Sequence, residues 1–543
     1  MHAVTRICST LILALLLFAG CGERETRVER GDSEQILYKG NGTEPQELDP
    51  QIVTGVTEHH IIMSLLEGLV TEDPHDLHPV PGVAESWDVS PSGTVYTFHL
   101  RRDAKWSNGE PVTARDFWNS YKRILTPSLG SEYAYMLYVV TNAQEFNENK
   151  ITDFNQVGFK VLDDWTFQIT LQSPTPYFLS LLNHVSWFPV HLPTIEKYGA
   201  PYERGNKWTR PGHYVGNGPF VLDEWKVNTV ISVKKSQTYW DRDHVHLNGI
   251  RFLPIDSLDA EERAFRAGQL HMTDSLPLSK IDFYKTNYPD LLVIEPYLGT
   301  YFYRVNVTKP PLNDKRIRRA LALAIDRESI VKNVTRGGQM PAYCFTPPGT
   351  AGYTCRTHLS EDLAEARRLL ADAGYPDGKG LPPIEILYNS SEAHRAIAEA
   401  IQQMWKKNLG VDAQLANQEW KVYLDAQRTL SYQVCRAAWI ADYVDPNSFL
   451  DMWLTDGGNN ETGWSDKEYD RLIAEAGRTT DPQQRLELFQ KAEAILLDEM
   501  PIIPIYFYTH VAARRPEVKG WWPTILDNHP YKYVYLETTN GHE

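Results

Sequence analysis

The residue most suggestive of chemistry in this sequence is Asp442, which follows a run of small and apolar residues at 437–441. Aspartate is rarely buried unless it is paired, because an isolated buried charge is costly. Two interpretations are open. In the first, Asp442 caps a helix or belongs to an internal ion pair where a strand ends. In the second, it lies in a cleft, where its carboxylate binds the ammonium group of a ligand.

The chain lacks the short motifs that mark common catalytic or metal sites. It has no HExxH, no GxSxG, no glycine-rich phosphate loop and no CxxC spacing. Its formal net charge of −16 argues against a nucleic-acid partner, which requires basic patches. Its 15 Trp, 29 Tyr and 18 Phe could form a sugar-binding surface or be buried in large α/β domains. We therefore expect a binding protein without metal or cofactor, and not an enzyme.

The N-terminus has the features of an export signal followed by a lipid attachment site. The apolar run at 11–19 is shorter than the roughly 20 residues that cross a bilayer, and it suits a signal peptide. Residues 17–21, Leu-Phe-Ala-Gly-Cys, resemble a bacterial lipobox. We expect a signal peptide over 1–20, lipidation of Cys21 and a flexible tether over 21–35. The alternative is ordinary cleavage near residue 20, with the cysteine there by chance.

Hydrophobic periodicity predicts a mixed α/β protein. A strand over 383–388, a helix over 392–408 and a strand over 411–415 form one βαβ unit. A further strand over 431–440 ends just before Asp442. Ligands of open α/β sheets bind at the carboxyl ends of strands, so this position favours a ligand-binding role for the aspartate.

The cysteines that follow the signal region are Cys344, Cys355 and Cys435. The first two lie in a loop-like segment and could form a disulfide in an oxidising compartment. Cys435 lies in a predicted strand, where we expect a small buried hydrophobic residue.

Several segments resemble the bacterial extracellular solute-binding proteins of the peptide and nickel class (family 5), which are substrate-binding subunits of ABC importers. The signature block is residues 84–125, and the resemblance covers most of the chain. It continues in ELDPQ, NGPFVLDEWKVN, PLNDKRIRRALALAIDRESIV and QMPAYCFTPPG. Within this class the chain is most similar to the oligopeptide-binding lipoproteins.

The resemblance implies an α/β, periplasmic-binding-protein-like fold of two lobes with an extra third domain (class II, cluster C type). We expect a discontinuous domain I over 36–66, 193–297 and 510–543. Domain II is expected over 67–192 and domain III over 298–509.

The resemblance also implies a peptide site around the motif A-x-W-x-A-D-Y. Asp442 takes the place of the family's aspartate, which pairs with the peptide's α-ammonium group. Trp439 and Trp420 take the places of side-chain pocket walls, and the strand around Ala438 and Ile440 would bond the peptide main chain. Taken singly, each tryptophan is more often a core residue.

Four further residues take the places of other family contacts. Arg436 and His394 match partners of the peptide's carboxyl terminus, Tyr133 matches a cleft tyrosine, and Val56 matches a backbone contact on the opposite lobe. From sequence alone, Arg436 could instead be the internal partner of Asp442, and the histidine could be a helix cap or a surface residue.

The chain also departs from the family pattern. Thr54, Gln427 and Thr335 stand where the family often has a glutamate, an arginine and a lysine, and Gly299 and Ile440 replace a cysteine pair. These changes leave the preferred peptide length and side chains open.

The resemblance thus implies a monomer that captures oligopeptides between two closing lobes and delivers them to an ABC permease. It would be an exported lipoprotein, periplasmic or at the cell surface, anchored to a bacterial membrane. The alternatives are a binder of another solute (murein peptide, metal chelate or oligosaccharide), a peptide sensor without its own permease, and a secreted hydrolase.

Overall fold

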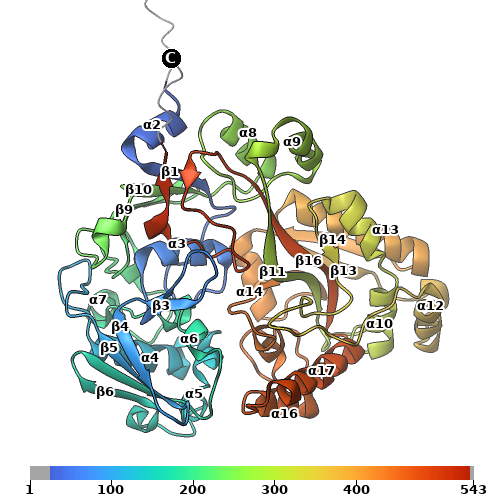
Figure 1. Cartoon of the computed structure of the whole chain (residues 1–543). Helices are drawn as coiled ribbons and strands as arrows, with labels where there is room; N and C mark the ends of the chain where they lie inside the picture. The colour runs from blue at the N-terminus through green and yellow to red at the C-terminus, as the bar shows by residue number, and fades with distance from the viewer. Residues whose placement is uncertain (1–24, 538–543) are drawn as a thin grey trace, which may run out of the picture.

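Three sheets of four or more strands organise residues 25–537, which are the residues that the computed structural model describes (Figure 1). The first has the order β1-β10-β9-β8. Its strands are β1 (Ile36–Gly40), β8 (Phe220–Lys226), β9 (Val230–Lys235) and β10 (Gly249–Leu253). β1 lies parallel to β10, so an N-terminal strand completes a sheet made by residues far along the chain. Helix α3 (Val56–Leu65) packs on this sheet through its buried apolar residues.

The second sheet is antiparallel, with the order β4-β5-β7-β6. Its strands are β4 (Ala84–Val89), β5 (Val95–Leu100), β6 (Phe159–Asp163) and β7 (Thr166–Thr170). Helix α4 (Ala114–Leu125) begins with a capping box, in which Thr113 and Asp116 satisfy each other's backbone N–H groups. Tyr121 of this helix packs against Phe159 and Phe167, so one aromatic cluster holds the helix on the sheet.

The third sheet has the order β12-β16-β11-β15-β13-β14. Its strands are β11 (Leu292–Val305), β12 (Met340–Pro341), β13 (Ile384–Asn389), β14 (Ala413–Gln418), β15 (Val434–Ile440) and β16 (Ile502–Ala513). The predicted βαβ unit is confirmed as β13, α13 (Glu392–Leu409) and the parallel β14. β14 begins two residues later than predicted, because Gly410 ends α13 in the left-handed region and the chain must then turn back.

The three sheets correspond to the three predicted domains, with one exception. The strands β11 and β16 pair antiparallel and run across the expected boundary between domains I and III, as Figure 1 shows. The fold class is confirmed as mixed α/β. The domain boundaries themselves stay predictions.

Part of the predicted tether is helical, which corrects that prediction. Helix α2 (Arg27–Glu34) starts with a capping box between Thr26 and Glu29, and Val28 is 6% exposed. The Val28 N–H donates to the Gly268 carbonyl at 3.0 Å, which fixes the helix on the first sheet's domain. A segment with so little apolar content carries no clear sequence signal for such docking.

The predicted signal peptide (1–20) and the lipidation site at Cys21 lie outside the described residues. Within residues 25–537, no helix has the length and apolar character needed to cross a membrane.

A buried ion pair links the first two domains and yields a stability prediction. Arg123 of α4 makes two hydrogen bonds with Asp49, at 2.6 and 3.1 Å, and the two side chains are 1% and 3% exposed. Asp49→Ala leaves the guanidinium buried without its charge partner, so we expect a loss of about 3 to 5 kcal/mol in the free energy of unfolding. Urea unfolding followed by tryptophan fluorescence measures this. Glu365→Ala, which removes an exposed partner of Arg368, is the control and should change stability by less than about 1 kcal/mol.

Candidate functional site

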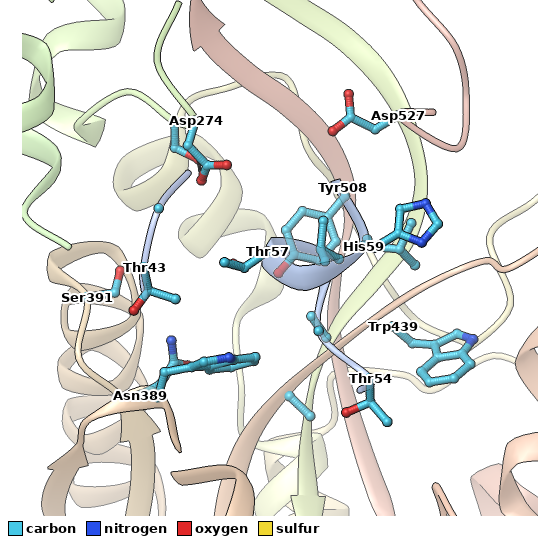
Figure 2. Close-up of a pocket in the computed structure, with 18 of the residues that line it drawn as sticks. Thr43, Thr54, Thr57, His59, Asp274, Asn389, Ser391, Trp439, Tyr508 and Asp527 are labelled. Carbon is cyan, nitrogen blue, oxygen red and sulfur yellow. Dashed lines mark hydrogen bonds between the residues drawn. The ribbon is translucent and has the colours of Figure 1, made fainter. Parts of the chain in front are cut away.

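A cavity of about 450 Å³ lies between the lobes, lined by residues of all three predicted domains. Figure 2 shows Thr54 and Trp439 on one side of it and Asp274 and Ser391 on the other. The structure brings all nine residues named as ligand contacts to this one cavity. They are Val56, Tyr133, His394, Trp420, Arg436, Ala438, Trp439, Ile440 and Asp442.

Asp442 follows the end of β15, and its side chain is 8% exposed. The Tyr133 hydroxyl donates to Oδ1 at 3.4 Å, and His184 Nε2 lies 3.3 Å from the same oxygen. The Asp442 N–H donates to Ser448 Oγ at 2.8 Å. Among the described residues, no lysine or arginine lies within 4.0 Å of this carboxylate. The interpretation as an internal ion pair with a lysine or arginine is therefore wrong.

The electrostatics of Asp442 follow from its burial. Desolvation raises the pKa of its carboxyl to about 8, and the hydrogen bond from Tyr133 opposes this only in part. Desolvation also lowers the pKa of His184 well below its usual range, so the neighbouring imidazole is neutral. The carboxyl group thus lies against the cavity without a compensating cation from residues 25–537. An ammonium group entering the cavity would supply one.

The strand that leads to Asp442 has a free edge beside the cavity. β15 pairs with β11 along its whole length, from Val434 to Ile440. On its other side it pairs with β13 only at Val434 and Cys435. Residues 436–440 have no strand partner there within the described part of the chain. The Arg436 carbonyl accepts hydrogen bonds from the side chains of Tyr423 and Gln427. The strand edge beyond it, at 437–440, can pair with an added extended peptide.

Arg436 lies on the same strand, with its side chain largely buried. It donates to the Tyr508 hydroxyl at 2.8 Å and to Asn389 Oδ1 at 3.3 Å, and its guanidinium lies 4.9 Å from the Tyr301 ring centroid. Its Nε has no acceptor among the described residues, and no described carboxylate lies within 4.0 Å of it. Arg436 is therefore not the internal partner of Asp442 and has donors available for an anion.

His394 lies beside this arginine at the first turn of α13, where Ser391 caps the helix. Its Nδ1 is 3.4 Å from the Tyr301 hydroxyl. Burial, together with the charge of Arg436, lowers the pKa of His394 well below its usual range. A neutral imidazole next to a guanidinium is suited to donate a second hydrogen bond to a carboxylate.

Aromatic side chains form the walls between these two ends. Trp439 donates from Nε1 to the Ser448 carbonyl at 2.6 Å, and its ring lies 6.4 Å from that of Tyr133. Trp420 begins α14 (Trp420–Arg428) and stacks on Tyr423 at 5.7 Å. Both indoles line the cavity, although Trp439 is only 7% exposed and also belongs to the hydrophobic core.

Sequence reasoning missed His184, Tyr506 and Tyr508, which also line the cavity. The two tyrosines lie two residues apart on β16, and this alternation in the sequence was a usable signal that they share one face of a strand. His184 comes from a loop of domain II, and only the tertiary structure brings it to Asp442. His59 also lines the cavity.

Contacts across the cavity join domain II to domain III. The Tyr133 hydroxyl reaches Asp442, Arg428 Nη1 lies 3.4 Å from Glu132 Oε1, and Asn459 Nδ2 donates to the Tyr135 hydroxyl at 3.3 Å. Domains II and III are therefore in contact with each other over the cavity.

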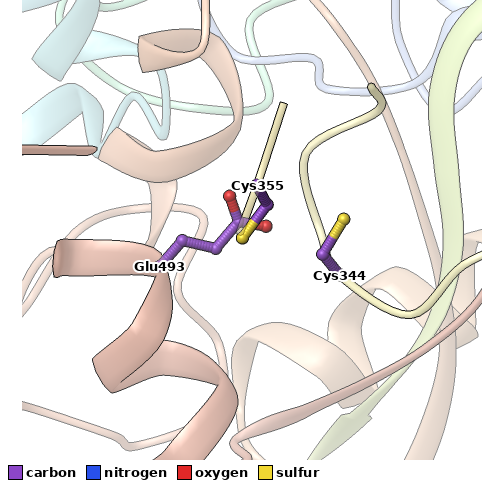
Figure 3. A group of neighbouring side chains, drawn as sticks. All are labelled: Cys344, Cys355 and Glu493. Atoms are coloured by element: carbon purple, nitrogen blue, oxygen red, sulfur yellow. The ribbon is translucent and has the colours of Figure 1, made fainter. Parts of the chain in front are cut away.

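Cys344 and Cys355 lie together at a separate place, with Glu493 beside them (Figure 3). Both are buried free thiols, so the predicted disulfide is not formed in this structure, although the ligating atoms of the three residues lie within 4.8 Å of one another. The Glu493 carboxylate already accepts hydrogen bonds from two backbone N–H groups and from the Tyr353 hydroxyl, at 2.7 to 2.8 Å. Cys435 is buried, as predicted.

Comparison with known proteins identifies the family of this chain. The sequence profile of the bacterial extracellular solute-binding proteins, family 5, matches residues 78–461. The periplasmic oligopeptide-binding protein OppA of Escherichia coli K12 is 42% identical over 515 residues, which cover 93% of each chain.

Two solved structures, one with a bound peptide and one unliganded and open, show which arrangement of the lobes this structure resembles. Haemophilus influenzae OppA in complex with RPPGFSPFR is 36% identical and superposes with a TM-score of 0.89, covering 93% of this chain and 100% of that one. The unliganded open form of the murein tripeptide-binding protein MppA (of E. coli) is also 36% identical, with 93% and 97% coverage, but its TM-score is 0.62. The lobes here thus have an arrangement unlike that open form. The chain belongs to family 5 of the bacterial extracellular solute-binding proteins.

Proposed function

We propose that this protein is the substrate-binding subunit of an ABC importer, which captures oligopeptides between its lobes and delivers them to a membrane permease. One observation carries the proposal. Three features of residues 25–537 line a single cavity. Within this range, the buried carboxyl group of Asp442 has no lysine or arginine partner, the guanidinium of Arg436 has no carboxylate partner, and the strand edge between them is free. A peptide offers the complement of each, namely an ammonium group, a carboxylate and an extended backbone.

These features assign a role to each element of the site. The edge of β15 around Ala438 and Ile440 pairs with the peptide main chain and gives sequence-independent affinity. Asp442 binds the α-ammonium and sets the register, while Arg436 and His394 bind the terminal carboxylate of a short peptide. Trp420 and Trp439 form walls for side chains, with Val56 contacting the backbone from the opposite lobe. Water in oversized pockets allows varied side chains.

The names of the relatives support this choice of solute. OppA of E. coli is an oligopeptide-binding protein, and the H. influenzae relative was solved with a nonapeptide. MppA binds a murein tripeptide, so a murein peptide is the nearest alternative ligand. Binding is proposed to be reversible, with no bond broken.

We further propose that the protein is a monomer and that it is anchored to a bacterial membrane through lipid on Cys21. The lipobox-like sequence supports the anchoring.

The role of Asp442 gives the main test. A hydrogen bond to a charged group contributes about 1.5 to 3 kcal/mol, so Asp442→Asn should weaken binding of a free tripeptide by about ten- to a hundredfold in calorimetric titration. Amino-terminal acetylation of the peptide should weaken binding to the wild type to a similar extent and have little further effect on the variant. Asp425→Asn, at an exposed acid on α14, serves as the matched control. Unchanged affinity in Asp442→Asn would contradict the proposed peptide site.

The pKa of Asp442 predicts how binding depends on pH. With its pKa raised to about 8 by burial, this carboxyl is protonated at neutral pH, and an ammonium ligand requires the ionised form. Binding to the protein with its lobes in the arrangement of this structure must therefore release a proton below pH 8, and affinity should fall by up to about tenfold for each unit that pH drops below 8. Above about pH 8 the peptide amine itself loses its proton. Calorimetry at pH 6.5 in buffers of different ionisation enthalpy counts the protons released, and Asp442→Asn should release none.

We also propose that Cys344 and Cys355 form a disulfide in the exported protein. Closing a loop of roughly ten to fifteen residues stabilises a fold by about 3 kcal/mol. Residues 25–537 purified from an oxidising compartment should then show one reactive thiol in denaturant, that of Cys435, and reduction should expose three and lower the melting temperature. A Cys344→Ser/Cys355→Ser variant should melt like the reduced protein. Three thiols before reduction would exclude the bond.

A further inference from the structure

We propose that a side pocket of the cavity, centred on Arg304, selects peptides that carry a hydrogen-bond-accepting side chain, above all an acidic one. The inference rests on the proposed peptide-binding function and adds a substrate class to it. The pocket, here called the Arg304 pocket, is formed by cavity-lining residues from four segments. They are Glu132, Arg304, Gln427, Arg428, Asn459 and Glu461.

The Arg304 pocket is distinct from the end of the cavity that holds Arg436. In the antiparallel pair of β11 and β15, Tyr303 lies opposite Arg436, whereas Arg304 lies opposite Cys435. Successive side chains of a strand point to opposite faces, so the two arginines lie on opposite faces of the sheet. Arg304 shares its face with Trp439, whose partner across the strands is Thr300. The pocket therefore receives a peptide side chain and not the peptide's carboxyl terminus.

Arg304 has hydrogen-bonding capacity that the described residues do not use. Its side chain is 7% exposed, and Nη1 pairs with Glu461 Oε2 at 2.5 Å. Nη2 donates to the Asn459 carbonyl at 2.9 Å. Its Nε is buried and has no acceptor among residues 25–537. A buried donor without an acceptor is unfavourable, and a ligand oxygen in the pocket would correct this.

The carboxylates around the pocket, in contrast, already have partners. Glu132 Oε1 lies 3.2 Å from Arg204 and 3.4 Å from Arg428, and Glu461 is bonded to Arg304. Three guanidinium groups thus meet two buried or half-buried carboxylates. Asp425 also contacts Arg428, but its side chain is 68% exposed, where water and salt screen it.

Burial also weakens the neutralisation of the Arg304 charge by Glu461. Desolvation raises the pKa of Glu461 to about 7, although Arg304 opposes this, so near neutral pH that carboxylate is only partly ionised. The pocket consequently presents positive charge and an unused donor. A carboxylate or amide oxygen fits this pocket, a lysine side chain would face an excess of guanidinium groups, and a leucine would leave the donor unsatisfied.

The test measures dissociation constants by calorimetry for trialanine and for tripeptides with Glu, Gln, Leu or Lys at each of the three positions. We expect one position at which Glu binds about tenfold or more tightly than Leu and Lys, with Gln between them. If no tripeptide binds, the proposed peptide-binding function fails. If trialanine binds but no position favours Glu over both Leu and Lys, only the present inference fails.

Variants then assign the preference to Arg304. Glu461→Gln removes the competing carboxylate and should raise the ratio of Glu-peptide to Lys-peptide affinity by about threefold or more. The double variant Arg304→Gln/Glu461→Gln removes both charges together, which avoids leaving one buried charge alone, and should bring that ratio close to 1. Arg368→Gln, at an exposed arginine on α12 (Leu363–Asp372), should keep the wild-type ratio. Two outcomes would overturn the role of Arg304. One is a wild-type affinity ratio in the double variant with an unchanged melting temperature, and the other is a preference of the wild-type protein for the Lys peptides.

Discussion

The feature on which the rest of the site depends is a carboxyl group removed from water with no lysine or arginine of residues 25–537 within 4.0 Å to compensate it. Asp442 is almost fully buried, and its nearest polar neighbours are a tyrosine hydroxyl and a neutral imidazole. Such a group pays its desolvation cost either by holding a proton or by gaining a positive partner. We propose that a ligand ammonium is this partner, which would concentrate binding energy on a group that every free peptide carries.

The fold keeps the opposite charges of the cavity apart. Arg436 and Asp442 are separated by the extended end of β15, at roughly 3.3 Å per residue, so they cannot neutralise each other. The charges that do meet, Arg304 with Glu461 and Arg428 with Glu132, lie on the pocket walls. In the proposed complex, the charges that have no ionic partner among residues 25–537 would meet the ends of the peptide, and the largely paired charges would surround its side chains.

The site exists only when the lobes meet. Tyr133 and His184 of domain II complete the surroundings of Asp442, which belongs to domain III. The strands β11 and β16 connect domain III with domain I, so a change in their twist would move one lobe against the other. The burial that raises the pKa of Asp442 therefore depends on the contact between domains II and III in this arrangement of the lobes.

The sequence by itself determined the local elements and the strand that ends at Asp442. Periodicity was enough for β13, α13 and β14, because apolar spacing and a glycine cap act locally. The family motif placed nine residues that the structure brings to one cavity. The docking of α2 was missed, because it depends on one valine and on a backbone bond to a distant glycine. The tertiary structure alone decided that, among the described residues, Asp442 lacks a cation and β15 has a free edge, and that His184 reaches the site. Burial, strand pairing and unused donors are relations between distant segments, and no local pattern encodes them.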